Sequence, residues 1–418
     1  MPALAVVSPF LDKRHGTERC ISEQVERFAH VYGYDVTIYS QRVEDIAGVT
    51  PGLQARSGSA GGGIFWRKVP ALLGPHLLNY VWWFFANQVC RWIDQRFRGM
   101  RFDLVYSPGI NCPDADVVAV HMVFAEFRQR LEPELRFLAT PLPGWPRLLH
   151  RRLYYRLVIA LEKRYYTSCD ALFVAVSRKT LADLTRFYGA PARKEVVYHG
   201  LHAELFSPEM RVRLRSAART ELGLKADVFA WLLIGNDWKK KGLPCLLETV
   251  ADLRERETCL LVVGQDDPSP YERTIERLGV TGLIRFLPLR RDVQTYYAAA
   301  DAYVGPSLED AFALPPAEAM ASGLPVIVSS QTGLSELVSD GEDALLLRDP
   351  KDAKQLRQLM ERLLRDSALR DRLGVNAARK MQQLTWERNA DEMDRIFRSV
   401  LAHKKTGGRV TSGFTGSA

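Results

Sequence analysis

Residues 303–328 limit the folds open to this chain more than any other segment. They comprise an apolar run, an acidic loop, a stretch typical of a helix that begins near Pro315 and stops at Gly323, and a second apolar run. A strand, a helix and a second strand in this order make one βαβ step, whose strands are parallel. Two carboxylates lie at the start of the helix, Asp310 in the loop and Glu318 about one turn in. Both can face a ligand held over the carboxyl end of the first strand, where open α/β sheets bind their ligands.

Apolar runs and helical patterns alternate along the rest of the chain as well. The 418 residues are too many for one typical core, so we expect two domains. Residues 207–225 are polar and charged, and the alternation restarts after them at residues 228–234. We therefore predict a domain boundary here, with domains at residues 1–206 and 207–387. The strands expected in the first domain are residues 3–7, 34–39, 103–107, 117–121 and 171–177.

The charge balance points to an anionic partner. The net charge is +8 and the pI is near 9.1, which suits a nucleotide, an anionic membrane surface or nucleic acid. A basic surface that is simply solvated accounts for the charge equally well. The sequence contains no compact nucleic-acid module, such as paired zinc ligands or a Lys/Arg-Gly-Phe box, so we predict no nucleic-acid partner.

The cysteines and acidic pairs do not indicate a metal site. The six cysteines are scattered without CxxC or Cys/His ligand spacing, which is typical of small buried residues in a reducing compartment. Asp266 and Asp267 precede Pro268, a pattern common in turns. No apolar run reaches the ~18 residues of a membrane span, and we expect no signal peptide. We therefore predict a cytoplasmic protein without a metal. Residues 404–418, rich in Gly, Ser and Thr, predict a disordered tail.

Two segments of the first domain combine aromatic and basic residues. Residues 75–98 predict a helix with consecutive aromatics at 82–85, which point around much of its circumference. The helix either packs rings into the core or presents a hydrophobic lip to a lipid-linked acceptor or a membrane surface. Residues 128–164 are rich in Arg and aromatics, which suits anionic lipid headgroups, although a solvated helix with snorkelling arginines explains the pattern nearly as well.

Three successive lysines follow the strand at residues 228–234. Lys239, Lys240 and Lys241 precede the next helix, where cations are disfavoured by the helix dipole. An anion held in the loop would resolve this conflict. We therefore favour a diphosphate site over a solvated charge run.

Several motifs resemble those of a known family. Asp310-x7-Glu318, followed by Ala-Met-Ala-Ser-Gly-Leu-Pro-Val-Ile, resembles the Glu-x7-Glu signature of family 4 glycosyltransferases. Asn236-x4-Lys241-Gly242 is similar to the family's Arg-x4-Lys-Gly. The segment Asn-Asp-Trp-Lys-Lys-Lys-Gly at residues 236–242, with residues 263–268 and 278–280 downstream, looks most like the lipopolysaccharide-core glucosyltransferases within the family.

The resemblance implies a fold and an activity. It implies an α/β GT-B fold, in which two Rossmann-like domains face each other across a cleft and a last helix at residues 388–403 returns to the first domain. It also implies a retaining, metal-independent hexosyltransferase that needs no cofactor and uses a nucleotide-sugar donor, with UDP-glucose the first expectation. The acceptor would be a saccharide or a lipid-linked cell-envelope molecule, reached by peripheral contact with the inner face of the membrane.

The resemblance also suggests roles for individual residues. Lys241 would neutralise the diphosphate, Asp310 would orient sugar hydroxyls, and His121 would lie against the sugar and phosphate, so these three are the catalytic candidates. Glu318 would hold the ribose hydroxyls. The full set of expected donor-binding residues is Gly16, Thr17, Asn236, Lys240, Lys241, Leu287, Asp310, Ala311, Phe312, Ala313, Leu314 and Glu318.

Four positions depart from the family pattern and keep other functions open. Asp310 replaces a Glu, Ala311 and Ala313 replace glycines, and Asn236 stands where the family has an Arg. Lys is a point charge that does not reproduce a bidentate Arg clamp. The alternatives are a non-hydrolysing nucleotide-sugar epimerase, which shares the GT-B layout, and an inactive nucleotide-sugar-binding partner.

Overall fold

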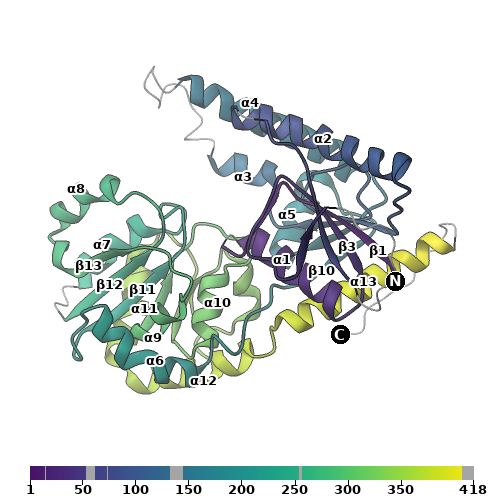
Figure 1. Ribbon diagram of the computed structural model, residues 1–418. Helices are drawn as coiled ribbons and strands as arrows, with labels where there is room; N and C mark the ends of the chain where they lie inside the picture. Colours follow the sequence, from purple (N-terminus) through teal and green to yellow (C-terminus); the bar gives the residue numbers. More distant parts are fainter. Residues whose placement is uncertain (15, 53–61, 73, 132–144, 254–256, 407–418) are drawn as a thin grey trace. The chain divides into compact units, whose positions relative to one another are not determined.

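The computed structural model describes residues 1–14, 16–52, 62–72, 74–131, 145–253 and 257–406 (Figure 1). The chain divides into two compact units. Unit 1 comprises Met1–Val197 with Glu387–Ala418, and unit 2 comprises Tyr198–Trp386. Most of the predicted disordered tail lies outside the described residues.

Unit 1 contains an eight-stranded sheet in which every described pairing is parallel. The strand order is β10-β9-β8-β7-β1-β3-β6-β5, so the chain order reverses between β1 and β7. At such a reversal the loops that leave the carboxyl ends of the strands run in opposite directions and leave a crevice. Open α/β sheets bind their ligands in that crevice. The strands are β1 (Ala3–Val7), β3 (Asp35–Ser40), β5 (Val49–Pro51), β6 (Ile64–Lys68), β7 (Leu104–Pro108), β8 (Val117–Val120), β9 (Leu172–Ala175) and β10 (Lys194–Val196), with a short pair β2 (Phe10–Leu11) and β4 (Arg42–Val43) beside them.

The helices of unit 1 follow the predicted alternation, with one correction. From the sequence, residues 8–19 are expected to form a loop and a helix is expected from about Ile21, whereas the helix starts at Gly16. Glu18 falls in its first turn, where the helix dipole favours a negative charge, and Ser22 donates to the carbonyl of Asp12 at 3.2 Å. The helices are α1 (Gly16–His30), α2 (His76–Phe97), α3 (Phe124–Leu131), α4 (Trp145–Tyr166), α5 (Arg178–Tyr188) and α13 (Trp386–Lys405).

The last helix, α13, completes the core of unit 1. Met393, Ile396 and Phe397 are buried against the sheet and α1. The ring of Phe397 lies 4.9 Å from that of Phe28 and 5.3 Å from that of Tyr106, centre to centre. Burying these apolar side chains is the main force that holds a helix from the end of the chain in the first unit.

The aromatic helix α2 uses one face for the core and exposes the other. Trp83 and Phe84 are 1% and 6% exposed, whereas Trp82 and Phe85 are 42% and 61% exposed. One face of the helix therefore packs its rings into the core, and the other face leaves rings exposed. Among the described residues, no helix is both long enough and apolar enough to cross a bilayer.

Unit 2 is a second parallel sheet with the strand order β13-β12-β11-β14-β15-β16. This is the order of a dinucleotide-binding Rossmann sheet, with its reversal between β11 and β14. The strands are β11 (Phe229–Ile234), β12 (Thr258–Val263), β13 (Ile284–Leu287), β14 (Ala302–Gly305), β15 (Val326–Ser329) and β16 (Leu345–Leu347). The helices are α6 (Pro208–Glu221), α7 (Leu243–Leu253), α8 (Ser269–Leu278), α9 (Gln294–Ala299), α10 (Leu314–Ala321), α11 (Ala353–Arg365) and α12 (Ser367–Met381), with short 3-10 turns η4 (Thr281–Leu283) and η5 (Gly333–Leu337).

The division between the units falls before residue 198, earlier than the boundary at 206/207 expected from the sequence. Residues 198–206 pack within unit 2, because the Leu201 amide donates to the Leu384 carbonyl at 2.8 Å. Gly200 lies so close to the backbone of Trp386 that a Cβ would come within 2.5 Å of it. The segment just after the division is therefore part of unit 2, which composition alone did not indicate.

Candidate functional site

The candidate site of unit 2 is built from two loops at the reversal of its sheet. Residues 235–242 connect β11 to α7, and residues 306–313 connect β14 to α10. The Leu308 amide donates to the Lys240 carbonyl at 2.8 Å. Gly242 has φ +83°, and a Cβ there would lie 2.0 Å from the carbonyl oxygen of Pro306. The two loops are therefore in direct backbone contact, which only glycine permits at position 242.

Two successive lysines pair with two successive acids across these loops. Lys241 Nζ lies 2.5 Å from Asp310 Oδ2, and Lys240 Nζ lies 2.8 Å from Glu309 Oε2. The side chains of Lys241 and Asp310 are only 16% and 22% exposed. Two cations and two carboxylates thus share one edge of the sheet, in the region that the sequence predicted for a phosphate and a polyol.

The pairing shifts the pKa values of Asp310 and Lys240. Burial raises the pKa of Asp310, but the charge of Lys241 and its hydrogen bond outweigh burial, so the net shift is downward. Burial lowers the pKa of Lys240, but the charge and hydrogen bond of Glu309 outweigh it, and the pKa is raised. All these shifts favour the charged forms near pH 7.

The loop itself holds Asp310 in place. Its Oδ1 accepts from the backbone amides of Phe312 at 3.2 Å and Ala313 at 2.9 Å, and its own carbonyl accepts from Gly333 at 3.0 Å. Ala313 has φ +75°, a left-handed conformation that is costly for a residue with a Cβ. The backbone of its own loop therefore holds the Asp310 carboxylate in place.

Glu318 lies in α10, the helix that follows the acidic loop, and is 3% exposed. The hydroxyl of Tyr297 donates to its Oε2 at 2.7 Å. Burial raises the pKa of Tyr303, and the charges of Asp310 and Glu318 raise it further. Both carboxylates are thus within electrostatic reach of one buried phenol, which places Lys241, Asp310 and Glu318 in the same part of unit 2.

The remaining expected donor-binding residues of unit 2 lie around the same edge. Asn236 accepts from the amide of Gln265 at 3.0 Å through its Oδ1. Leu287 ends β13, and its carbonyl accepts from the Gly264 amide at 3.1 Å. Phe312 is buried, with its ring 5.2 Å from that of His199. The segment that follows the acidic pair supplies the others, Ala311, Ala313 and Leu314.

The candidates of unit 1 lie at the carboxyl edge of its own sheet. Gly16 and Thr17 open α1, and His121 follows the last residue of β8. Burial lowers the pKa of His121 to about 4, so its imidazole is neutral near pH 7.

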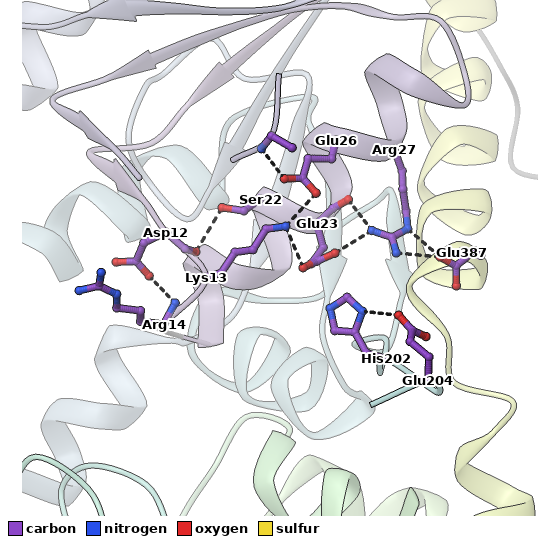
Figure 2. A network of polar contacts seen from close by, with 11 residues as sticks. Asp12, Lys13, Arg14, Ser22, Glu23, Glu26, Arg27, His202, Glu204 and Glu387 are labelled. Carbon is purple, nitrogen blue, oxygen red and sulfur yellow. Dashed lines mark hydrogen bonds and ion pairs between the residues drawn. The ribbon is translucent and has the colours of Figure 1, made fainter. Parts of the chain in front are cut away.

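A charged network that the sequence did not reveal holds the start of α1 (Figure 2). Lys13 Nζ lies 3.3 Å from Glu23 Oε1 and 2.8 Å from Glu26 Oε2. Arg27 contacts Glu23 and Glu387, each at 2.7 Å, and so joins α1 to the first turn of α13. The positive charge of Lys13 is therefore matched inside unit 1.

The partners of the site residues were not predictable from the sequence to the same degree. Glu309 stands beside Asp310, and its pairing with Lys240 could have been expected from the two adjacent lysines. Tyr297 had no such signal, because the position of its side chain depends on how distant elements pack.

Two family models match the chain. The model described as Glycosyltransferase Family 4 matches residues 14–205, and the model described as Glycosyl transferases group 1 matches residues 229–366. Each covers the greater part of one of the two sheets.

Curated relatives match over part of their length. The lipopolysaccharide glucosyltransferase WaaG of Escherichia coli K12 is 28% identical over 228 residues, which are 53% of this chain and 61% of that protein. A D-inositol 3-phosphate glycosyltransferase of Streptomyces bingchenggensis is 33% identical over 244 residues, 55% of this chain and 52% of that protein. The aligned part thus spans about half to three fifths of these relatives.

Solved structures share the fold of the whole chain. The crystal structure of WaaG has a TM-score of 0.75 at 22% identity and covers 97% of this chain and 100% of that chain. Sucrose-phosphate synthase from Thermosynechococcus elongatus has a TM-score of 0.74 at 20% identity, with 96% and 100% covered. Anabaena HepE in complex with UDP and glucose has a TM-score of 0.66 at 18% identity, with the same coverage. The fold is that of the GT-B glycosyltransferases, with two Rossmann-like domains.

Proposed function

Since this chain belongs to the family 4 glycosyltransferases, we propose that it transfers a sugar from a nucleotide diphosphate sugar to a hydroxyl group of a saccharide or lipid-linked acceptor. UDP-glucose is the proposed donor, in keeping with the glucosyltransferase and UDP-bound structure among its relatives. The observation that carries the proposal is the pairing of Lys240 and Lys241 with Glu309 and Asp310 at the reversal of a Rossmann sheet.

The two lysines would stabilise the leaving nucleotide. Without donor each is neutralised by a carboxylate, and a diphosphate would compete with those carboxylates for the ammonium groups. Negative charge grows on the diphosphate as the sugar bond breaks, and fixed cations lower the energy of that transition state. Two lysines at this position would supply that stabilisation without a metal ion.

The carboxylates would then bind hydroxyl groups. Asp310 is held by two backbone amides, so when Lys241 turns to a phosphate oxygen, Oδ2 is free to accept from a sugar hydroxyl. Glu318 accepts from Tyr297 through Oε2, and we assign it to the ribose hydroxyls. Catalysis in this scheme rests on positioning and electrostatics, and we assign no nucleophile. The proposed outcome is retention at the anomeric carbon, by a same-face substitution that the leaving phosphate assists.

Replacing Lys241 tests this proposal. Lys241→Ala should lower turnover by more than roughly tenfold, the loss expected when one electrostatic stabiliser is removed. Lys239→Ala is the matched control, since Lys239 precedes the pair and is exposed. Wild-type kinetics for Lys241→Ala would contradict the phosphate assignment. A new epimer formed from donor alone, without acceptor, would instead indicate the epimerase alternative.

We also propose that unit 1 contacts an anionic membrane through α2 and α4, which lie side by side (Figure 1). The ring of Tyr80 in α2 lies 5.6 Å from that of Tyr154 in α4. Large apolar side chains are exposed on both helices: Leu78, Trp82, Phe85, Val89, Trp92 and Phe97 on α2, and Trp145, Leu149 and Leu153 on α4.

The charge of α4 suits such a membrane. Its exposed polar residues include Arg147, Arg151, Arg156, Lys163 and Arg164, and its one acidic residue, Glu162, is buried. Apolar side chains enter the lipid boundary while neighbouring cations attract anionic headgroups, at ~1 kcal/mol per cation.

Sedimentation with vesicles tests the membrane contact. The protein should bind phosphatidylglycerol-containing vesicles at low salt and dissociate as salt rises. Trp92→Glu should weaken binding severalfold, whereas Val212→Glu should not, since Val212 is an exposed apolar residue in α6. Equal binding to neutral and anionic vesicles, or no binding at low salt, would contradict the proposal.

A further inference from the structure

The lysine loop is tied to the neighbouring loop of the sheet by an acidic residue. Residues 264–268 follow β12, which pairs in parallel with β11. Asp266 Oδ1 accepts from the backbone amide of Asp237 at 3.0 Å, and Oδ2 accepts from that of Trp238 at 2.6 Å. In the other direction, Asn236 accepts from the amide of Gln265 at 3.0 Å. Each loop thus supplies a side-chain acceptor to the backbone of the other.

These bonds hold a backbone conformation that is otherwise unfavourable. Asp237 has φ +58°, in the left-handed region. Its own Oδ1 accepts from the Lys240 amide at 3.2 Å, and its carbonyl accepts from the Lys241 amide at 2.9 Å. The turn that Asp266 fixes is therefore the turn that places the two lysines.

Close packing around the two loops restricts the hydrogen bonds between them. Trp238 is 1% exposed, and its ring lies 4.9 Å from that of Phe286, centre to centre. A Cβ on Gly264 would come within 2.5 Å of both Trp238 Nε1 and the Gly235 carbonyl. Close packing holds the two loops against each other, and in this arrangement the carboxylate of Asp266 reaches both amides.

We infer that Asp266 is a positioning residue for nucleotide-sugar binding, which acts through the backbone of residues 237–241 to place Lys240 and Lys241 against the diphosphate. The inference rests on the proposed function. It assigns to Asp266 a role distinct from that of Asp267, which accepts from the amide and hydroxyl of Ser269 at the start of α8. A carboxylate is required because it offers two acceptor oxygens, whereas an amide would turn a donor toward one of the two N–H groups.

The experiment compares Asp266→Asn with Asp267→Asn and Lys241→Ala, measuring KM for UDP-glucose, KM for the acceptor, kcat and the melting temperature. We expect Asp266→Asn to raise the donor KM about tenfold with the acceptor KM unchanged, and Asp267→Asn to leave both unchanged. A purely structural role would lower the folded fraction, and hence kcat, without moving the donor KM of the folded enzyme. If Asp266→Asn melts below the assay temperature, Asp266→Glu, which keeps the charge but displaces the oxygens, replaces it with the same expectation.

Two results would overturn the inference in distinguishable ways. A raised donor KM in Lys241→Ala with a wild-type donor KM in the folded Asp266 variant would refute the positioning role and leave the proposed function standing. A wild-type donor KM and kcat in Lys241→Ala would refute the phosphate site itself, and the role of Asp266 with it.

Discussion

Removing the charge of the buried Glu162 should change how the stability of the protein depends on pH. Glu162 lies in α4 and is 1% exposed. Its carboxylate accepts from the backbone amide of Phe124, at 3.2 and 3.1 Å from its two oxygens, and from the hydroxyl of Tyr188 at 2.6 Å. It therefore joins α4 to the start of α3 and to the end of α5.

The size of the effect follows from its pKa. Burial raises the pKa of Glu162 to about 7, against the hydrogen bonds of Tyr188 and Phe124, which lower it. The ordinary value is 4.5, and one pKa unit corresponds to about 1.4 kcal/mol, so ionising this group in the folded state costs about 3 kcal/mol.

The sign follows from linkage. Between about pH 4.5 and 7 the folded state binds more protons at this site than the unfolded state does, so the free energy of unfolding falls as pH rises through that range. Below about pH 4.5 the carboxyl group is protonated in both states and does not lower the free energy of unfolding. Above about pH 7 it is ionised in both states, and the loss of stability no longer changes with pH. Glutamine at this position keeps the shape without a charge and should abolish this contribution.

The assay is urea unfolding of wild-type protein and Glu162→Gln at pH 5 and pH 8. The stability difference between variant and wild type should shift in favour of the variant by about 2.5 kcal/mol between these two pH values, since at pH 5 the unfolded carboxyl is already mostly ionised. Glu195→Gln, at an exposed position, should show no such shift. Parallel pH profiles for Glu162→Gln and wild type would refute the reasoning.

Three further predictions concern packing. Gly242→Ala should destabilise the protein by about 2 kcal/mol or more and weaken UDP binding in calorimetry, because its Cβ would collide with Pro306; Gly279→Ala has a similar φ of +70° but open space, and should cost only about 1 kcal/mol. Arg219→Met should lower the free energy of unfolding in urea by about 3 kcal/mol, because Arg219 is buried and pairs with Asp301 at 3.2 Å while donating to the carbonyl of Ala299 at 3.0 Å. Phe397→Ala should cost about 3–5 kcal/mol by the same measurement and make α13 sensitive to proteolysis, since the ring is fully buried; Val375→Ala, at an exposed site, should have little effect.

Local patterns in the sequence were sufficient for the α/β class and for the edge of the sheet where the site lies. Strands such as β11 and β12 are continuous apolar runs buried along almost their whole length, and such runs separated by helical segments predict parallel strands. Because parallel strands all present their carboxyl ends at one edge, a lysine after one strand and an aspartate after another are expected near each other. Lys241 and Asp310 meet there at 2.5 Å.

Tertiary structure alone decided which groups pair and which surfaces stay exposed. The role of Asp266 depends on the register between β11 and β12, because that register brings a side chain of one loop onto the backbone of the other. The local sequence Asp-Asp-Pro does not indicate that register. The sequence also did not show which face of α2 is buried. Consecutive aromatics such as Trp82 and Trp83 are chemically alike and differ only in which of them contacts the core. Propensity and periodicity act over a few residues, so they can be recognised in a sequence. Burial and pairing depend on contacts between residues far apart in the chain, so they are known only from the folded protein.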